Sequence, residues 1–223
     1  MPSRYPVTRR DVLGTVSALG GLALVHSAFG KTGSLTPTPA QTAGPFYPSP
    51  RPLEQDMDLS MLAGHKERAK GQLLDVTGRV LDQDGKPVAG ARVEIWQANT
   101  YGRYDHPKDI NPAPLDPNFQ GFGVLTTDAQ GRYRFRTIKP GAYPINPVNP
   151  NAVRTPHIHF DVAQGTQKLV TQMYFPNEPL NASDRIFAAL GAAQVAAVSQ
   201  IVPEAAVVEP GVVRIHWDIV LAS

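Results

Sequence analysis

From about residue 74 onward, hydrophobic and polar residues alternate in short runs, which is the pattern of half-buried β-strands. The first turn sequence, Asp82-Gln-Asp-Gly85, predicts a hairpin, and a second, Asp128-Ala-Gln-Gly131, precedes another alternating run. Several short strands separated by turns predict an all-β protein with a β-sandwich core. The expected strands cover residues 74–81, 88–97, 132–137, 151–163, 168–175 and 212–221.

Little helix is expected. Residues 59–66 suit one or two helical turns, and Ser183 is placed as the N-cap of an alanine-rich stretch that reaches Gln200. Residues 31–55 contain many prolines and predict an extended arm. Residues 56–223 then form one domain, with short helices and long loops around the sandwich, and this length is enough to bury a core.

The first 30 residues have the composition of an export signal rather than of the fold. Thr8-Arg-Arg-Asp-Val-Leu13 and the apolar stretch that follows it to about Val25 predict the twin-arginine route, with cleavage near Gly30. A retained membrane anchor is the alternative, but the stretch is short and rich in glycine for a span. We therefore expect a periplasmic or secreted protein.

Charge adds little to the functional picture. Without residues 1–30, the 21 basic and 19 acidic residues become 18 of each, because that segment holds three arginines and one aspartate. The sequence pI of about 8.9 therefore owes much to the signal and does not indicate nucleic-acid binding.

The strand expected at 151–163 contains His157 and His159, which would project from the same face because residues two apart on a strand do so. The chain has no cysteine, which excludes thiolate zinc sites and iron–sulfur clusters. Tyr104 and Tyr143 lie in turns rich in glycine and proline, where catalytic groups are common. Two phenolates and two imidazoles suit a hard trivalent cation, and the charge count favours ferric iron.

Residues 93–106 (VEIWQANTYGRYDH) resemble the intradiol ring-cleavage dioxygenases, particularly the iron-bearing (beta) chain of the protocatechuate 3,4-dioxygenases. The likeness covers roughly residues 40–220, and the order and spacing of the two tyrosines and two histidines match the family's ligand set. Further family signatures are similar to segments 115–119, 136–144, 154–160 and 168–175.

The resemblance implies one non-haem Fe(III) ion per chain, bound by Tyr104, Tyr143, His157 and His159. Tyr104 and His157 would be equatorial ligands, and Tyr143 and His159 axial ones. Tyr143 would leave the iron when substrate chelates it and would accept a catechol proton.

The implied reaction is cleavage of a catechol-type diol by O2 between the two hydroxylated carbons, to a cis,cis-muconate product. Arg154 and Gln172 match active-site residues of the family, and an arginine beside the ring would stabilise negative charge on the substrate. The expected partners are therefore a small aromatic diol and O2, with a homo-oligomer or a related chain as the protein partner. Which diol is cleaved, and the oligomeric state, stay open.

Two other interpretations remain. Segments 78–91 and 127–133 also resemble transthyretin-like and carboxypeptidase-regulatory-like modules, which bind without catalysis. The histidines could instead serve a divalent-metal hydrolase, for which Asp161 is the carboxylate on the same face. A ferric tyrosinate protein would be red-brown, whereas both alternatives would be colourless.

Overall fold

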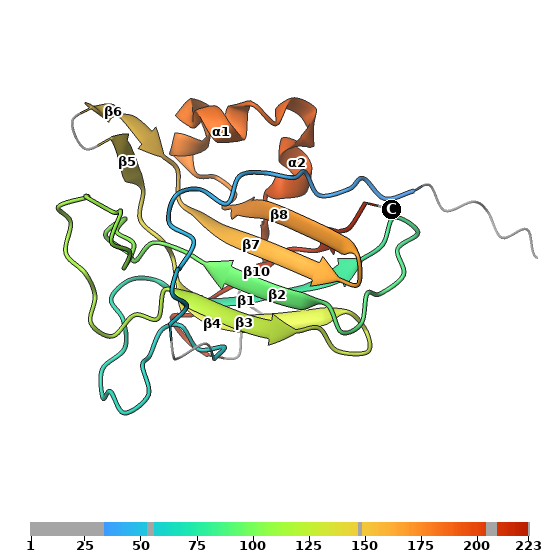
Figure 1. Ribbon diagram of the computed structural model, residues 1–223, viewed down its shortest axis with the longest axis horizontal. Helices are drawn as coiled ribbons and strands as arrows, with labels where there is room; N and C mark the ends of the chain where they lie inside the picture. The colour runs from blue at the N-terminus through green and yellow to red at the C-terminus, as the bar shows by residue number, and fades with distance from the viewer. Residues whose placement is uncertain (1–33, 53–55, 147–148, 204–208, 223) are drawn as a thin grey trace, which may run out of the picture. The chain divides into compact units, whose positions relative to one another are not determined.

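The computed structural model describes residues 34–52, 56–146, 149–203 and 209–222. The expected export signal, residues 1–30, lies outside them. Residues 34–52 contain neither helix nor strand and run as an extended arm along the strand-bearing part of the chain (Figure 1). Among the described residues, no helix is both long and apolar enough to cross a membrane.

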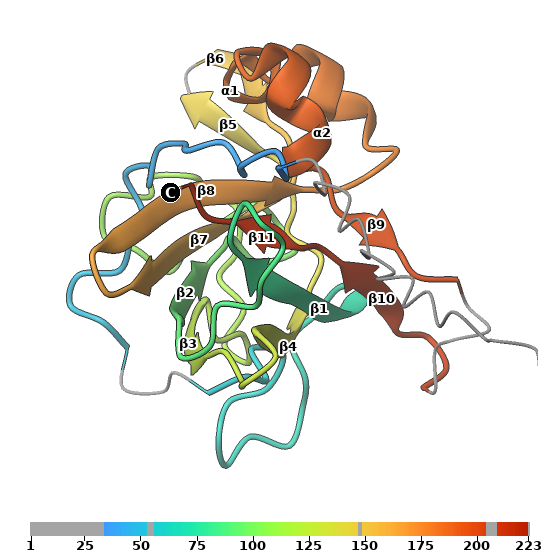
Figure 2. The same ribbon diagram turned by 90° about the vertical axis from the view of Figure 1, so that its right-hand side faces the viewer.

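Two β-sheets form a sandwich, as the sequence predicts (Figure 2). The first sheet has the order β11-β1-β10-β9, and a fifth strand, β4, also pairs with β1. Its central strand β1 is antiparallel to β4 but parallel to β10 and β11. The strands of this sheet are β1 (Leu73–Leu81), β4 (Arg132–Ile138), β9 (Gln200–Ile201), β10 (Val213–His216) and β11 (Ile219–Val220).

The second sheet is antiparallel throughout, with the order β3-β2-β7-β8. A separate two-stranded sheet, β5 with β6, lies beyond one end of it (Figure 1). These strands are β2 (Arg92–Trp96), β3 (Phe122–Thr126), β5 (Tyr143–Asn146), β6 (Asn149–Arg154), β7 (His157–Gln164) and β8 (Gln167–Tyr174).

The strand β7 has one face in the core and one face on the outside of the sandwich. Ile158, Phe160 and Val162 are completely buried in the core between the sheets, with apolar side chains of β1, β2 and β4. His157 and His159 lie on the opposite face because side chains alternate along a strand. The alternation that the sequence predicts is therefore confirmed, and the histidine face is covered by the arm.

The predicted hairpin at residues 82–85 is wrong in part. The turn forms, since Lys86 N donates to Asp82 Oδ1 and Val88 N to the Val80 carbonyl. However, β1 and β2 then separate into different sheets instead of pairing along their lengths. The turn at 128–131 likewise connects β3 in one sheet to β4 in the other. A turn sequence determines where the chain reverses direction, whereas packing of the apolar side chains in the core determines which strands pair.

The helical expectations are the least accurate. Residues 59–66 form turns and bends, not a helix. The stretch 183–200 is interrupted by Gly191, which has a φ of +54°, and its cap is Asp184 rather than Ser183. The helical segments are α1 (Arg185–Ala188) and α2 (Gln194–Ala197), with 3₁₀ turns at Pro179–Ser183 and Gly191–Ala193.

Candidate metal centre and active site

Tyr104 and Tyr143 come together because two glycine-bearing loops pass very close to one another. A Cβ on Gly102, whose φ is +75°, would lie 2.1 Å from the Ala142 carbonyl oxygen, and a Cβ on Gly141 would lie 2.4 Å from the Thr100 carbonyl oxygen. Only glycine fits such an approach. The loop after β2 therefore presents Tyr104 next to Tyr143, the first residue of β5, and their rings meet edge to face at 5.5 Å.

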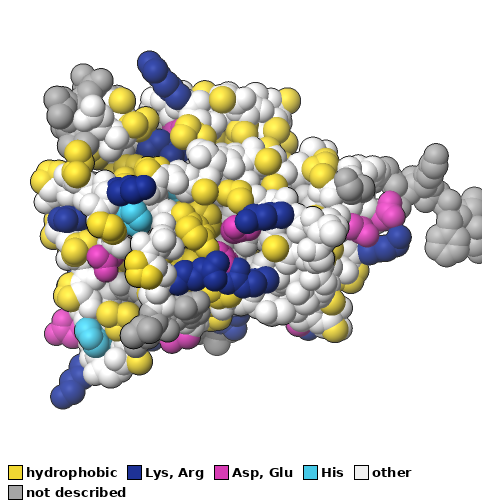
Figure 3. All heavy atoms as spheres, in the orientation of Figure 1, with side chains coloured by type: hydrophobic (Ala, Val, Ile, Leu, Met, Phe, Trp, Pro, Cys, Tyr) yellow, Lys and Arg dark blue, Asp and Glu magenta, His cyan; other side chains and the backbone are white. Residues whose placement is uncertain are grey.

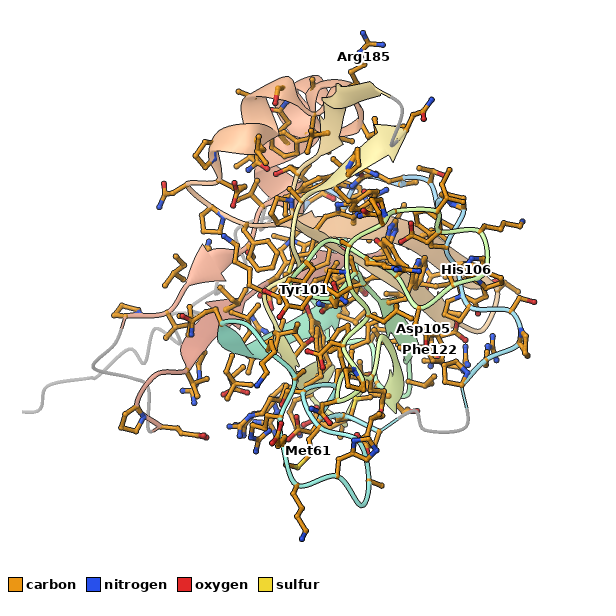
Figure 4. The ribbon with its side chains drawn as sticks, turned by 90° about the vertical axis from the view of Figure 1, so that its left-hand side faces the viewer. Met61, Tyr101, Asp105, His106, Phe122 and Arg185 are labelled. Carbon is orange, nitrogen blue, oxygen red and sulfur yellow. The ribbon has the colours of Figure 1, made fainter. Side chains whose placement is uncertain are left out.

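Figure 4 views this side of the molecule, where the loop carrying Tyr101, Asp105 and His106 passes over the strands. The backbone of that loop is fixed by its own side chains. Asp109 Oδ2 accepts a hydrogen bond from Tyr104 N at 2.7 Å, and Asn111 Nδ2 donates to the Gly102 carbonyl at 2.8 Å. Both tyrosine side chains are buried.

His157 and His159 lie side by side on β7, each about 2% exposed, with their Nε2 atoms 3.2 Å apart. His157 Nδ1 is 2.7 Å from the Thr155 carbonyl oxygen, which can only accept, so Nδ1 carries the proton. The lone pair of His157 Nε2 is therefore free to point toward His159 and toward the Tyr143 hydroxyl, which is 3.5 Å away. Two imidazole nitrogens and a phenol oxygen thus converge.

Burial controls the protonation of all four groups. It lowers the pKa of His157 well below its usual value, with the Arg154 guanidinium as the second cause. The pKa of His159 is lowered well below its usual value by burial and then by His157. Burial also raises the pKa of Tyr143 and, more strongly, that of Tyr104. Without a bound cation, the site consists of neutral imidazoles and neutral phenols.

The donor set fits a hard metal ion. The Tyr104 hydroxyl and His159 Nδ1 are buried without a hydrogen-bond partner among the described residues, and an unsatisfied buried polar group costs about 1–3 kcal/mol. A cation bound to the Tyr104 oxygen would remove the cost of leaving that hydroxyl without a partner. The described residues hold no cluster of three or more His, Cys, Asp or Glu suited to a metal, so the two phenols are the candidate oxygen donors beside the histidine pair.

Asp161, the ligand that a divalent-metal hydrolase would need, is engaged elsewhere. Its carboxylate pairs with Lys168 at 3.0 Å. It lies two residues beyond His159, opposite Val170 of β8. Among the described residues, no carboxylate therefore joins the histidine pair to form the three-ligand site that a hydrolase would need.

Arg154 and Gln172 lie together beside the metal-ligand candidates. Arg154 Nη2 donates to Gln172 Oε1 at 2.6 Å, and Arg154 Nε donates to Asp184 Oδ2 at 2.8 Å. Gln172 lies on β8 directly opposite His159. All three side chains are buried, and a guanidinium bound on two sides is fixed in orientation.

Several residues that complete the site were not identified from the sequence. Asp184 was missed because a carboxylate 30 residues after Arg154 shows no pattern with it. Trp96 is buried on the outer face of the sheet, where its ring stacks on His159 with 4.8 Å between ring centroids and 4° between ring planes. Tyr47 of the arm packs edge-on against Trp96, with 5.0 Å between the ring centroids. The alternation of β2 could have placed Trp96 outside.

Two hollows lie next to the site. The smaller, about 150 Å³, is lined by Phe46, Trp96 and Tyr104 with Phe122 of β3, which Figure 4 labels. The larger, about 390 Å³ and open to solvent, is bounded by Pro45 and Phe46 of the arm, residues 108–110, and residues 144–146. A wider groove of about 840 Å³ is lined by residues of β1, β3 and β4, and none of the six candidate site residues lines it.

Comparison with known proteins gives a consistent set of relatives. The family model described as "Dioxygenase" matches residues 42–223. The protocatechuate 3,4-dioxygenase beta chain of Burkholderia cepacia is 55% identical over 134 residues, which are 59% of this chain and 57% of that protein. A hydroxyquinol 1,2-dioxygenase of Rhizobium sp. is 38% identical over 155 residues, 65% of this chain and 50% of that protein. The match therefore spans about half the length of these relatives.

Among solved structures, the dioxygenase domain of a dioxygenase–carbohydrate-binding protein fusion from Streptomyces sp. SirexAA-E superimposes with a TM-score of 0.62. It is 30% identical in sequence, and the match covers 84% of this chain and 99% of that domain. The sandwich, the loops that carry the tyrosines and the strand that carries the histidines all lie within the segment that the family model matches.

Proposed function

Since the chain belongs to the intradiol ring-cleavage dioxygenase family, we propose that it cleaves a catechol-type diol with O2 between the two hydroxylated carbons. Both oxygen atoms of O2 enter the product, a cis,cis-muconate, so no external reductant is needed. The observation that carries the proposal is the convergence of four donors. Two Nε2 atoms lie 3.2 Å apart, the Tyr143 hydroxyl is 3.5 Å from one of them, and the Tyr104 ring lies beside Tyr143 with a hydroxyl that has no hydrogen-bond partner in the described part of the chain.

The family uses non-haem ferric iron, and we propose that Tyr104, Tyr143, His157 and His159 hold it. When bound, the metal lowers the pKa of the diol hydroxyls and makes the ring reactive toward O2. Two phenolates leave a ferric centre with one net positive charge, which lowers the cost of burying it. The neutral imidazoles supply nitrogen lone pairs without adding charge.

Tyr143 is proposed as the base for one diol proton. Burial raises the pKa of its phenol, and the Arg154 guanidinium partly offsets this increase. A phenolate with a raised pKa takes up a proton readily, so the Tyr143 oxygen can accept the proton of an incoming diol hydroxyl.

Arg154 is proposed to stabilise negative charge that develops on the ring. Its guanidinium has five N–H donors, more than the contacts to Gln172 and Asp184 use. Because both partners are buried, the charge acts in a region of low dielectric, where its effect on the substrate is strongest. Gln172 holds the orientation of the guanidinium.

The diol is proposed to reach the metal from the 390 Å³ hollow between the arm tip and β5. Ile110 and Ile145 on its rim are largely exposed, at 73% and 54%, so the entrance is apolar on two sides. Relatives are named for protocatechuate and hydroxyquinol, and both diols belong in the substrate panel, with catechol and substituted catechols. We further propose export by the twin-arginine route and action outside the cytoplasm, on the basis of residues 1–30.

The test is oxygen uptake by the purified full chain after loading with ferric iron, measured against that panel. We expect a red-brown protein that consumes one O2 per diol and forms a muconate absorbing in the near ultraviolet. An iron-loaded protein that turns over none of the diols would refute the enzymatic proposal. Localisation is tested separately, by replacing Arg9 and Arg10 with lysine and fractionating the cells.

A further inference from the structure

Glu94 of β2 is a buried carboxylate held mainly by residues of the arm. Its side chain is 1% exposed, and its Oε2 accepts a hydrogen bond from the Tyr47 hydroxyl at 2.5 Å. Its Oε1 forms ion pairs with Arg51 Nη2 at 2.7 Å and with the guanidinium of Arg92. Arg51 also donates to the Tyr47 hydroxyl at 2.8 Å, so the three groups form a closed triangle.

This carboxylate needs the arm in order to be buried. A desolvated carboxylate is costly unless it is paired and hydrogen-bonded. Arg92 supplies one cation from the same strand, while Tyr47 and Arg51 come from a segment more than 40 residues earlier in the chain. Both arginine side chains are more than 40% exposed, so solvent weakens their attraction to Glu94. The hydrogen bond from Tyr47 is therefore the most protected part of the attachment.

The arm residues fixed in this way contact the candidate ligands. The Phe46 ring lies 4.7 Å from the Tyr104 ring and 6.1 Å from the Tyr143 ring. The Tyr47 ring lies edge-on to Trp96 at 5.0 Å, and Trp96 stacks on His159. The Tyr174 ring lies 6.0 Å from His157, and its hydroxyl donates to Gln41 of the arm at 2.8 Å. Each of the four proposed iron ligands thus has an aromatic neighbour that belongs to the arm or touches it.

The same segment reaches the other side of the site. Gln172 Nε2 donates to the Thr42 carbonyl at 3.0 Å, and Gln41 Nε2 donates to the Gln172 carbonyl at 3.2 Å. Gln172 in turn accepts from Arg154. On the face seen in Figure 3, basic side chains gather in a band across the middle, next to acidic and apolar ones.

We propose that Glu94 is a positioning residue for the metal site. Through Tyr47 and Arg51 it holds arm residues 41–51 against the sheet. The arm in turn fixes the orientation of the phenol and imidazole ligands. The part that concerns ligand orientation rests on the proposed function. The attachment of the arm does not depend on a metal.

The test compares three variants, Tyr47→Phe, Arg51→Gln and Glu94→Gln, with the control Arg79→Gln. Arg79 lies on β1 of the other sheet, pairs with Asp218, and has a side chain about as exposed as that of Arg51. Tyr47→Phe keeps the ring on Trp96 and deletes only the hydroxyl. It is therefore the variant least able to disturb the fold, and it carries the test if Glu94→Gln does not fold.

The first measurement is hydrogen exchange of the backbone amides of residues 41–47 by mass spectrometry, on the full chain without metal. We expect exchange about tenfold faster in Tyr47→Phe and Arg51→Gln, as the loss of a hydrogen bond to a charged group implies, and unchanged exchange in Arg79→Gln. Exchange within twofold of wild type in the arm variants would overturn the proposal.

The second measurement is made on the iron-loaded proteins. We expect the visible tyrosinate band of Tyr47→Phe to move and its KM for diol to rise more than kcat falls. If the arm exchanges faster but the visible band and the kinetic constants do not change, Glu94 attaches the arm without positioning the ligands. This result would also overturn the proposal. A wild-type protein without any visible band would instead contradict the proposed function, while the exchange result would still decide whether Glu94 fixes the arm.

Discussion

The Asp184 carboxylate joins the active-site arginine to the helical segment, and Asp184→Asn is expected to show how much this connection contributes to stability. One oxygen, Oδ2, accepts from Arg154 Nε at 2.8 Å and from Thr155 N at 2.9 Å. The other, Oδ1, accepts from Ile186 N at 2.8 Å and from Phe187 N at 3.0 Å, which caps α1. The side chain is completely buried.

Asparagine has nearly the same shape but only one acceptor oxygen. Whichever way the amide turns, its NH2 group faces two N–H donors, so two of the four hydrogen bonds are lost. Hydrogen bonds to a charged group contribute about 1.5–3 kcal/mol each. Breaking a buried ion pair, which also leaves Arg154 without its countercharge, costs about 3–5 kcal/mol. We therefore expect the free energy of unfolding to fall by about 3–5 kcal/mol.

The assay is urea unfolding of the metal-free protein, followed by tryptophan fluorescence. With a slope of about 2–3 kcal/mol per molar urea, the midpoint should fall by about 1–2 M. Arg79→Gln, which breaks an exposed pair with Asp218, should change the unfolding free energy by less than about 1 kcal/mol. If Asp184→Asn lowers the midpoint no more than this control, the reasoning from buried hydrogen bonds is refuted.

Four further outcomes follow from the site and the core. His159→Ala should lose bound iron, measured by metal analysis, and a variant that keeps full colour would contradict the ligand assignment. Tyr143→Phe should shift the visible band and slow diol binding in stopped-flow traces, because the proposed base is gone. Phe160→Ala, in the core on the opposite face of β7, should lower stability by about 3–5 kcal/mol in urea yet leave the band position of the iron-loaded protein unchanged. Chelating the iron should lower the melting temperature by roughly 10 °C, and adding ferric iron back should restore it, since a ligand at a thousand times its Kd stabilises by about 4 kcal/mol.

The sequence predicts the parts of the fold that depend on local patterns. Alternation identifies β1, β4 and β8 within a residue at either end, and the common face of His157 and His159 follows from the same rule. Strands β3 and β5 were missed because they are short and lie next to glycine- or proline-rich loops. The expected strand at 151–163 is divided at Thr155 and Pro156, where the chain passes from the small sheet to the large one.

What local pattern cannot predict is which distant residues meet. The attachment of Glu94 to Arg51, the stacking of Trp96 on His159 and the pairing of Arg154 with Asp184 all join segments separated in sequence. Each depends on how the sheets and the arm are arranged, which composition and periodicity do not specify. The histidine pair is the exception, because both members belong to one strand.

The division of β7 between core and site has a consequence for the register of this strand. The side chains at positions 157, 159 and 161 lie on the outer face of the sheet, which carries the candidate metal site. The side chains at positions 158, 160 and 162 point into the core between the two sheets. A substitution on one side leaves the contacts of the other side in place, so metal binding and core packing can be perturbed separately, as His159→Ala and Phe160→Ala are expected to do. A one-residue slip in the register of β7 against β2 and β8 would exchange the two sets and bury the imidazoles among leucine, isoleucine and phenylalanine. The pairing of β7 with its two neighbouring strands is therefore as necessary for the metal site as the histidines themselves.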